Sequence, residues 1–440
     1  MNLLHGNIKK LYFTFLLSAL GSTIISSIYS MVDMICVGRY AGPIGSAAIA
    51  CVNPFWTIMF APGVLLGMGG AVMMSNRRGS NNGDSADKYF TLATSLSVII
   101  AVIVFAVIFF FPEPLLIFFG AEGEILKACL EYTKPVAFAA PTFTVCACIS
   151  TFIRNDGEVI LPTVATIAGG VVNIFGDIFF VFDFGLGLGV FGAGLATTIG
   201  QIISFLILCS YFLRKKCRLK FTRPDRILDR LSKIFTVGLS AFVVEVSFGV
   251  VTVVFNKIIT KNFSPDHLAV YGTVSSVLFT LQCVLMTFGA ALQPIVSANF
   301  GAKNEKRIRG VLNLALITSL ATGVIFMIFT QAFPTQILKM CMDTNENVLI
   351  IGPPILRKYM SAILVSGISI VASHYLQSIL KRTMSATVSI LRASVLPAAF
   401  AILLTALFSV DAIWYSMAIS EFLTAIISLI FIGKVNKRPI

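Results

Sequence analysis

Five charged residues stand out within the long apolar stretches of this sequence. They are Asp33, Asp177, Glu245, Arg392 and Glu421. If these stretches cross a membrane, each charge near mid-span costs roughly 2.5–3.5 kcal/mol on insertion scales, so each one requires a partner or a function. These residues are the first candidates for chemistry.

Two of the acids have positions that predict a shared pocket. Asp33 and Asp177 lie near the same end of two apolar stretches, and Asn173 precedes Asp177 by one helical turn. If the two helices are neighbours, two close carboxylates cannot both ionise at low cost, so one should retain a proton. The same oxygen atoms are suitable ligands for a hard cation such as Na⁺. We therefore expect a site for H⁺ or Na⁺; the alternative is two independent acids that reach water or lipid headgroups.

The other three charges belong to the second half of the chain. Glu245, at the centre of the seventh stretch, is either a second protonatable group, a partner for a cationic substrate, or a hydrogen-bonding group between helices. Arg392 and Glu421 lie on the last two stretches, at depths that differ by roughly 6 Å of helical rise. We expect them to form a structural ion pair. The remaining candidates for a cavity in this half are Gln282, Gln293 and Gln377.

The elements that must position these residues are twelve apolar stretches. Of the 440 residues, 57% are hydrophobic and 12% are charged, and the mean hydropathy is +0.91. A soluble chain carries about 25% charged residues, so this composition indicates an integral membrane protein. Stretches of about 20 residues or more are long enough to span a bilayer. They cover 11–37, 47–75, 89–111, 128–153, 159–182, 190–213, 234–256, 268–299, 311–333, 354–380, 384–409 and 412–433.

Basic residues are concentrated in every second gap between these stretches. Of 33 lysines and arginines, Arg392 lies deep within a span and eight belong to the opposite side, in the other set of gaps or at the adjoining ends of spans. The remaining 24 lie on the side of the two chain ends, which the positive-inside rule assigns to the cytoplasm. The net charge of +13 therefore reflects topology, and we expect no nucleic-acid partner. The longest polar segment, 214–233, reads as a basic cytoplasmic connector.

A weak internal repeat divides the chain into two halves. A shift of 222 residues superposes Gly67 on Gly289 and Ser75 on Ser297, among others. Two six-helix halves with the same orientation are common in transporters, which hold substrate between them. We expect an all-α membrane protein with an N-lobe over 1–213, a connector over 214–233 and a C-lobe over 234–440.

Several motifs resemble the multidrug and toxic compound extrusion (MATE) family, in its bacterial branch, which includes staphylococcal exporters. The pieces that carry the resemblance are YSMVDMICVG at 29–38, GMGGAVMMS at 67–75, RNDG at 154–157, NIFGD at 173–177, GLGVFGAGLAT at 187–197 and ALQPIVSANFGA at 291–302. Their order and spacing cover nearly the whole chain.

The resemblance implies two pseudo-symmetric six-helix lobes around a V-shaped cavity. It also implies antiport, in which entry of H⁺ or Na⁺ drives export of amphipathic, often cationic, compounds. The family's ion-coupling positions in the N-lobe match Asp33, Asn173, Asp177 and Thr197, and a seventh-helix acid of some members matches Glu245. Two departures stand out: Ser18 replaces a first-helix proline, so that bending there would depend on Gly21, and the tenth span has no acid.

We therefore expect a monomeric antiporter in the bacterial inner membrane, with both termini cytoplasmic and no cofactor beyond the coupling ion. Its expected partners are membrane lipids and small amphipathic organic cations. A lipid II or lipid-linked oligosaccharide flippase of the same superfamily is the first alternative, but its pyrophosphate cargo calls for several cavity-facing cations. An intramembrane enzyme is disfavoured because the three histidines form no metal motif. A passive channel is the last alternative.

Overall fold

The computed structural model describes residues 2–80, 83–342 and 346–437. Within these residues the chain is helical with no strand, and twelve helical segments are long and apolar enough to cross a membrane. They run over Ile8–Gly42, Ala47–Gly79, Ser85–Phe110, Gly123–Asn155, Ile160–Val181, Gly189–Leu213, Ile227–Asn262, Asp266–Gly301, Glu305–Ala332, Glu346–Ser378, Arg382–Leu407 and Val410–Asn436. Each coincides with one of the twelve predicted stretches, so the predicted all-α membrane fold is confirmed.

The chain forms two compact units, which we call unit 1 and unit 2. The main segment of unit 1 is Leu17–Gly238, and unit 2 combines Leu4–Leu16 with Leu239–Ile440. The boundaries between the units therefore fall inside the first and seventh spanning helices, and the basic segment 214–226 belongs to unit 1.

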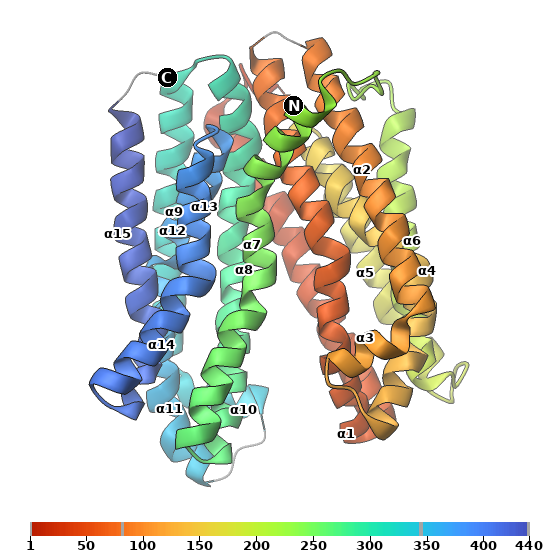
Figure 1. Cartoon of the computed structure of the whole chain (residues 1–440), viewed down its shortest axis with the longest axis vertical. Helices are drawn as coiled ribbons and strands as arrows, with labels where there is room; N and C mark the ends of the chain where they lie inside the picture. Colours follow the sequence, from red (N-terminus) through yellow and green to blue (C-terminus); the bar gives the residue numbers. More distant parts are fainter. Residues whose placement is uncertain (1, 81–82, 343–345, 438–440) are drawn as a thin grey trace. The chain divides into compact units, whose positions relative to one another are not determined.

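Unit 1 is built mainly from α4, α5 and α6, with α6 packed against both of the others and α2 packed against α4 (Figure 1). Its elements are α1 (Ile8–Gly79), α2 (Gly83–Phe110), α3 (Pro112–Phe118), α4 (Gly123–Asn155), α5 (Ile160–Val181), α6 (Gly189–Cys209), the 3₁₀ turn η1 (Ser210–Leu213) and the start of α7 (Ile227–Asn262).

Unit 2 is organised around α12, which packs against α8, α9 and α15 (Figure 1). Its elements after α7 are α8 (Pro265–Gly301), α9 (Glu305–Ala332), α10 (Pro334–Cys341), α11 (Glu346–Met360), α12 (Ile363–Ser378), α13 (Arg382–Ile390), the π-helical turn η2 (Leu391–Val395), α14 (Leu396–Leu407), the 3₁₀ turn η3 (Val410–Tyr415) and α15 (Ser416–Asn436).

Glycines determine how the first two spans are joined and packed. α1 contains both spans, and the one non-helical residue within it is Gly42, with φ of +61°, a conformation that costs glycine little. Ser18 and Gly21 therefore lie in regular helix. At Gly67 an added Cβ atom would lie 2.9 Å from the Cα atom of Cys148 on α4. Helices in a membrane associate through such close packing of small residues.

The described residues near both ends of the chain contact the start of α9 in unit 2. Arg307 Nη2 donates to the carbonyl of Gly6 at 2.7 Å, and Arg309 Nη2 donates to the carbonyl of Asn436 at 3.0 Å. The N-terminal segment and the end of α15 are therefore on the same side of the spanning helices.

Candidate ion-binding site

Unit 1 encloses a cavity of about 420 Å³ between α1, α4, α5 and α6. Among the polar side chains that line it are Asp33, Tyr132, Asn173 and Thr197, together with Arg154 and Gln201. Three of the four residues predicted for ion coupling therefore line this cavity, together with Tyr132, and the fourth, Asp177, is outside its lining.

A chain of hydrogen bonds connects these residues. Tyr132 Oη on α4 donates to Asp33 Oδ2 on α1 at 2.8 Å and lies 3.4 Å from Thr197 Oγ1 on α6. Asn173 Nδ2 on α5 donates to the same Thr197 oxygen at 3.0 Å. Because the one hydroxyl hydrogen of Tyr132 is directed to Asp33, Thr197 accepts from Asn173 and is left to donate to Tyr132. Four helical spans thus meet at one polar cluster, and Thr197 links α5 to α4.

A glycine on α6 allows this meeting. An added Cβ atom at Gly200 would lie 3.2 Å from the Cβ atom of Asn173. With hydrogen in place of that side chain, α5 and α6 approach closely enough for Asn173 to reach Thr197. The spacing of small residues therefore sets the geometry of the polar cluster.

Asp177 is fully buried on α5, one turn beyond Asn173. α5 packs against the first span, since an added Cβ atom at Gly170 would lie 3.0 Å from a ring carbon of Tyr29, so Asp177 is on a helix adjacent to the one that carries Asp33. Both Asp177 carboxylate oxygens, Asp33 Oδ1 and Asn173 Oδ1 are buried without a hydrogen-bond donor from the protein. Buried polar atoms of native proteins almost always have partners, so four such acceptor oxygens on two adjacent helices fit a site that accepts a proton or a cation.

The chemistry of this cluster suits H⁺ and Na⁺ better than a transition metal. Its atoms are carboxylate, amide and hydroxyl oxygens, which favour hard cations. Among the described residues no group of three or more histidine, cysteine, aspartate or glutamate side chains is placed to hold a metal ion. The predicted residues therefore form an oxygen-rich cluster in which protonation or cation binding would remove charge repulsion.

Two residues of the cavity were not found from the sequence. Tyr132 lies near the start of α4 and Asp33 near the end of the first span, and because these helices run in opposite directions, a comparison of depths would have paired them. Arg154 reads as a loop residue in the sequence. In the structure it is the penultimate residue of α4, and its Nη2 donates to Ser22 Oγ at 3.2 Å. Ser22 precedes Asp33 by about 16 Å of helical rise, so the cavity has an acid and a cation far apart along α1.

Unit 2 contains a smaller cavity of about 70 Å³ beside a buried ion pair. Arg392 Nε and Glu421 Oε1 are 3.1 Å apart, Gln282 Nε2 donates to the same oxygen at 3.1 Å, and Ser369 Oγ donates to Glu421 Oε2 at 3.1 Å. Arg392 lies on the π-helical turn η2, a type of turn that is frequent at functional sites. The sequence predicts an ion pair between Arg392 and Glu421 and places Gln282 in a cavity, and the structure brings all three residues together at this cavity.

The other polar candidates of unit 2 lie outside this cavity. Glu245 is exposed on α7, next to Val244, which lines the cavity. Gln293 and Gln377 are buried between helices; Gln293 Nε2 donates to Ser297 Oγ at 3.4 Å. The structure thus brings together Gln282, Arg392 and Glu421, and places the remaining three residues elsewhere.

Comparison with known proteins was made on sequence and on structure. Multidrug export protein MepA of Staphylococcus saprophyticus is 24% identical over 425 residues, covering 94% of this chain and 91% of that protein. MepA of Staphylococcus aureus is 25% identical, with the same coverage. The probable multidrug resistance protein YoeA of Bacillus subtilis is 23% identical and covers 76% of this chain and 74% of its own length.

The fold also matches solved structures. An outward-facing conformation of a multidrug resistance MATE family transporter has a TM-score of 0.90 at 20% identity, covering 99% of this chain and 97% of that one. A MOP superfamily transporter from Pyrococcus furiosus has a TM-score of 0.91 with the same identity and coverage.

A single family model, MatE, matches residues 19–179 and again 239–403. These segments begin 220 residues apart, close to the shift of 222 that the internal repeat indicates. Together they cover about three quarters of the chain. The chain therefore belongs to the MatE family.

Proposed function

We propose that this protein is a cation-coupled antiporter that exports amphipathic, often cationic compounds, and that it transports without catalysing a reaction. The observation that carries the proposal is the cluster of donor-less acceptor oxygens on Asp33, Asn173 and Asp177 beside the cavity of unit 1. The names of the related proteins, which describe multidrug export, support the choice of cargo.

In the proposed mechanism the cluster alternates between two charge states. When Asp33 and Asp177 are ionised, their charges attract a cationic compound to the cavity. When a proton or Na⁺ neutralises them, the attraction is lost, and the hydrogen bond from Tyr132 to Asp33 rearranges because its acceptor has changed. Ion and drug are coupled only if they favour different states of the protein.

Transport by purified protein in proteoliposomes tests this proposal. Efflux of a fluorescent organic cation such as ethidium would be measured with a pH gradient and a sodium gradient imposed separately. We expect Asp33→Asn and Asp177→Asn to abolish gradient-driven efflux, whereas Asp183→Asn, which changes an exposed acid just beyond α5, should leave it unchanged. Undiminished efflux in both site variants would refute the proposal.

Arg154 is the one observation that favours the flippase alternative, because it places a cation in the cavity of unit 1. A pyrophosphate carries several negative charges, and a single arginine opposite a pair of carboxylates is a poor match for it. Transport of a lipid-linked pyrophosphate, lost in Arg154→Gln and retained in Asp33→Asn, would replace the antiporter with the flippase.

The setting of the transporter is part of the proposal. We propose a monomer in the bacterial inner membrane with both termini in the cytoplasm, in contact with membrane lipids and with no cofactor apart from the coupling ion. The basic residues beside the two termini support this orientation through the positive-inside rule.

A further inference from the structure

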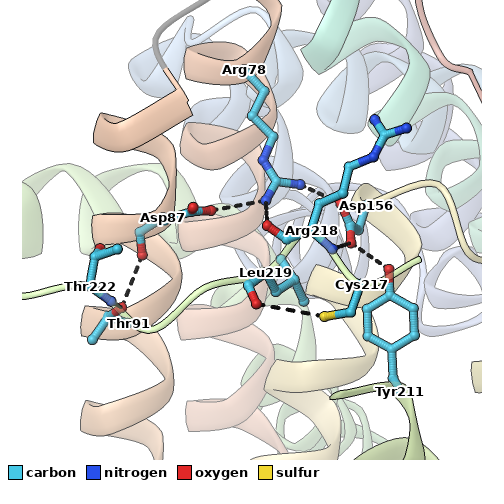
Figure 2. Close-up of polar contacts among 9 residues, drawn as sticks. All are labelled: Arg78, Asp87, Thr91, Asp156, Tyr211, Cys217, Arg218, Leu219 and Thr222. Atoms are coloured by element: carbon cyan, nitrogen blue, oxygen red, sulfur yellow. Dashed lines mark hydrogen bonds and ion pairs between the residues drawn. The ribbon is translucent and has the colours of Figure 1, made fainter. Parts of the chain in front are cut away.

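The segment 214–226, which we call the connector segment, is held against unit 1 by a buried carboxylate. Asp156, at the end of α4, accepts hydrogen bonds from Arg78 Nη1, from Tyr211 Oη and, at 3.0 Å, from the backbone nitrogen of Arg218 (Figure 2). Arg78 Nη2 also donates to the carbonyl of Arg218 at 2.8 Å and pairs with Asp87 at 3.0 Å. The backbone at Arg218 is therefore bound on both its donor and its acceptor.

Further contacts hold the rest of the segment on α2. The backbone nitrogen of Thr222 donates to Thr91 Oγ1 at 2.9 Å (Figure 2). Asp225 pairs with Lys88 at 3.0 Å and with Arg230 at 2.6 Å. The connector segment thus has a fixed path across unit 1.

Its side chains present an uncompensated positive charge. Six cations in ten consecutive residues are exposed, and among the described residues none of them has an ion-pair partner; they are Arg214, Lys215, Lys216, Arg218, Lys220 and Arg223. The one acid of the segment, Asp225, is already engaged by Lys88 and Arg230. Contacts that hold the segment therefore use its backbone and its acid, and leave its cations free for a partner.

Large apolar side chains accompany these cations. Leu213 is 88% exposed, Phe221 is 63% exposed and Leu228 is 83% exposed. The segment also starts directly after the span that ends at Leu213 and stops directly before the span that begins at Ile227. It therefore lies at the level of the membrane interface, where exposed apolar groups contact lipid and cations meet headgroups.

We propose that the connector segment is a preformed binding surface for anionic phospholipid headgroups. Lipid phosphates complement the positive charge of the connector segment, and the segment lies at the membrane interface, where these phosphates are. A soluble polyanion would complement the charge too, but it would leave the three apolar side chains in water. Because the backbone is already fixed, binding a headgroup orders few additional groups, and such pre-organisation favours affinity.

A tryptophan reporter at Phe221 tests the proposal. The two native tryptophans would be replaced in the variant Trp56→Phe, Trp414→Phe, Phe221→Trp, and quenching would be measured in micelles containing brominated phosphatidylglycerol or brominated phosphatidylcholine. We expect half-maximal quenching at a much lower mole fraction of brominated phosphatidylglycerol than of brominated phosphatidylcholine. Each basic residue near an anionic surface contributes about 1 kcal/mol, which is about fivefold in affinity. Adding Lys215→Gln, Lys216→Gln and Lys220→Gln should therefore weaken the response to phosphatidylglycerol about a hundredfold.

A matched control removes three exposed lysines from the opposite ends of the helices, in Lys257→Gln, Lys261→Gln and Lys339→Gln. It has the same net charge and should bind phosphatidylglycerol like the parent. If the reporter variant does not fold, native mass spectrometry of the full chain counts retained phosphatidylglycerol for both triple variants. Equal quenching by the two lipids, equal loss in both triple variants, or complete displacement of the lipid by an equal charge of polyglutamate would overturn the proposal. None of these readouts requires transport, so the result is independent of the proposed antiport.

Discussion

The ion pair between Arg392 and Glu421 gives a quantitative prediction about unit 2. Glu421 is fully buried and Arg392 is 6% exposed. Removing one partner of a buried pair leaves the other charge uncompensated, which typically costs about 3–5 kcal/mol. The two single replacements should differ, because a buried carboxyl can be neutralised by taking up a proton and a guanidinium cannot.

We therefore expect Glu421→Gln to destabilise unit 2 by about 3–5 kcal/mol. Arg392→Met should destabilise unit 2 by less, because Glu421 can then take up a proton. This destabilisation should decrease as the pH is lowered, since protonation of Glu421 becomes easier. In the double variant no charge remains buried, so its cost should be no larger than that of Glu421→Gln alone. The coupling energy between the two sites would then be at least as large as the cost of Arg392→Met alone, and a double-mutant cycle measures it.

The distribution of tryptophan provides the assay. The chain has two tryptophans, Trp56 in unit 1 and the buried Trp414 in unit 2. In a Trp56→Phe background, fluorescence during an SDS titration in mixed micelles reports on unfolding of unit 2 alone. If the two single costs simply add in the double variant, or if Glu421→Gln costs less than about 1 kcal/mol, the ion pair does not stabilise unit 2 and the reasoning fails.

Three further predictions concern unit 1. Tyr132→Phe removes the hydrogen-bond donor to Asp33. Because a hydrogen bond to a charged group contributes about 1.5–3 kcal/mol, efflux should fall about tenfold or more while ethidium binding persists. Unchanged efflux would exclude Tyr132 from coupling. Gly67→Ala should lower the free energy of unfolding of unit 1 by about 1–3 kcal/mol, because the added methyl group overpacks against Cys148. Trp56 fluorescence in a Trp414→Phe background measures this change. Hydrogen bonds from Lys88 and then Arg230 lower the pKa of Asp225 to about 2, below its unfolded value of about 3.9. The stabilisation from ionised Asp225 is therefore present above pH 4 and is lost as the pH falls through 2. In the parent protein, the rate of pepsin cleavage within 214–226 should rise as the pH is lowered from 4 to 2. In Asp225→Asn the rate should already be high at pH 4.

The twelve spans could be predicted from the sequence because the bilayer imposes one requirement on all of them. A helix must be apolar for about 20 residues to cross, and this property is local and additive along the chain. The counts of lysine and arginine in the gaps predict the orientation in the membrane for a similar reason, and that orientation stays a prediction. The acids at 33 and 177 were also conspicuous, because a charge in an apolar stretch needs a reason wherever it lies.

The partners of those acids were harder to predict, because they depend on which helices are neighbours. Tyr132 is one buried aromatic residue among many until α4 is placed beside α1. Arg154 resembles a loop residue until α4 is seen to continue to Asn155. The bound path of the connector segment depends on Asp156, Arg78 and Tyr211, which are far apart in the chain.

The sequence by itself therefore determined that this chain has twelve stretches long and apolar enough to cross a membrane, and which charges within them need an explanation. The tertiary structure alone decided that Tyr132, Asn173 and Thr197 connect four helices around Asp33, and that the π-helical turn at Leu391–Val395 carries the arginine that pairs with Glu421. The physical reason is that transfer of a residue into the membrane depends mainly on its own polarity. A hydrogen bond between helices instead depends on distances of about 3 Å, which are set by the packing of many residues at once.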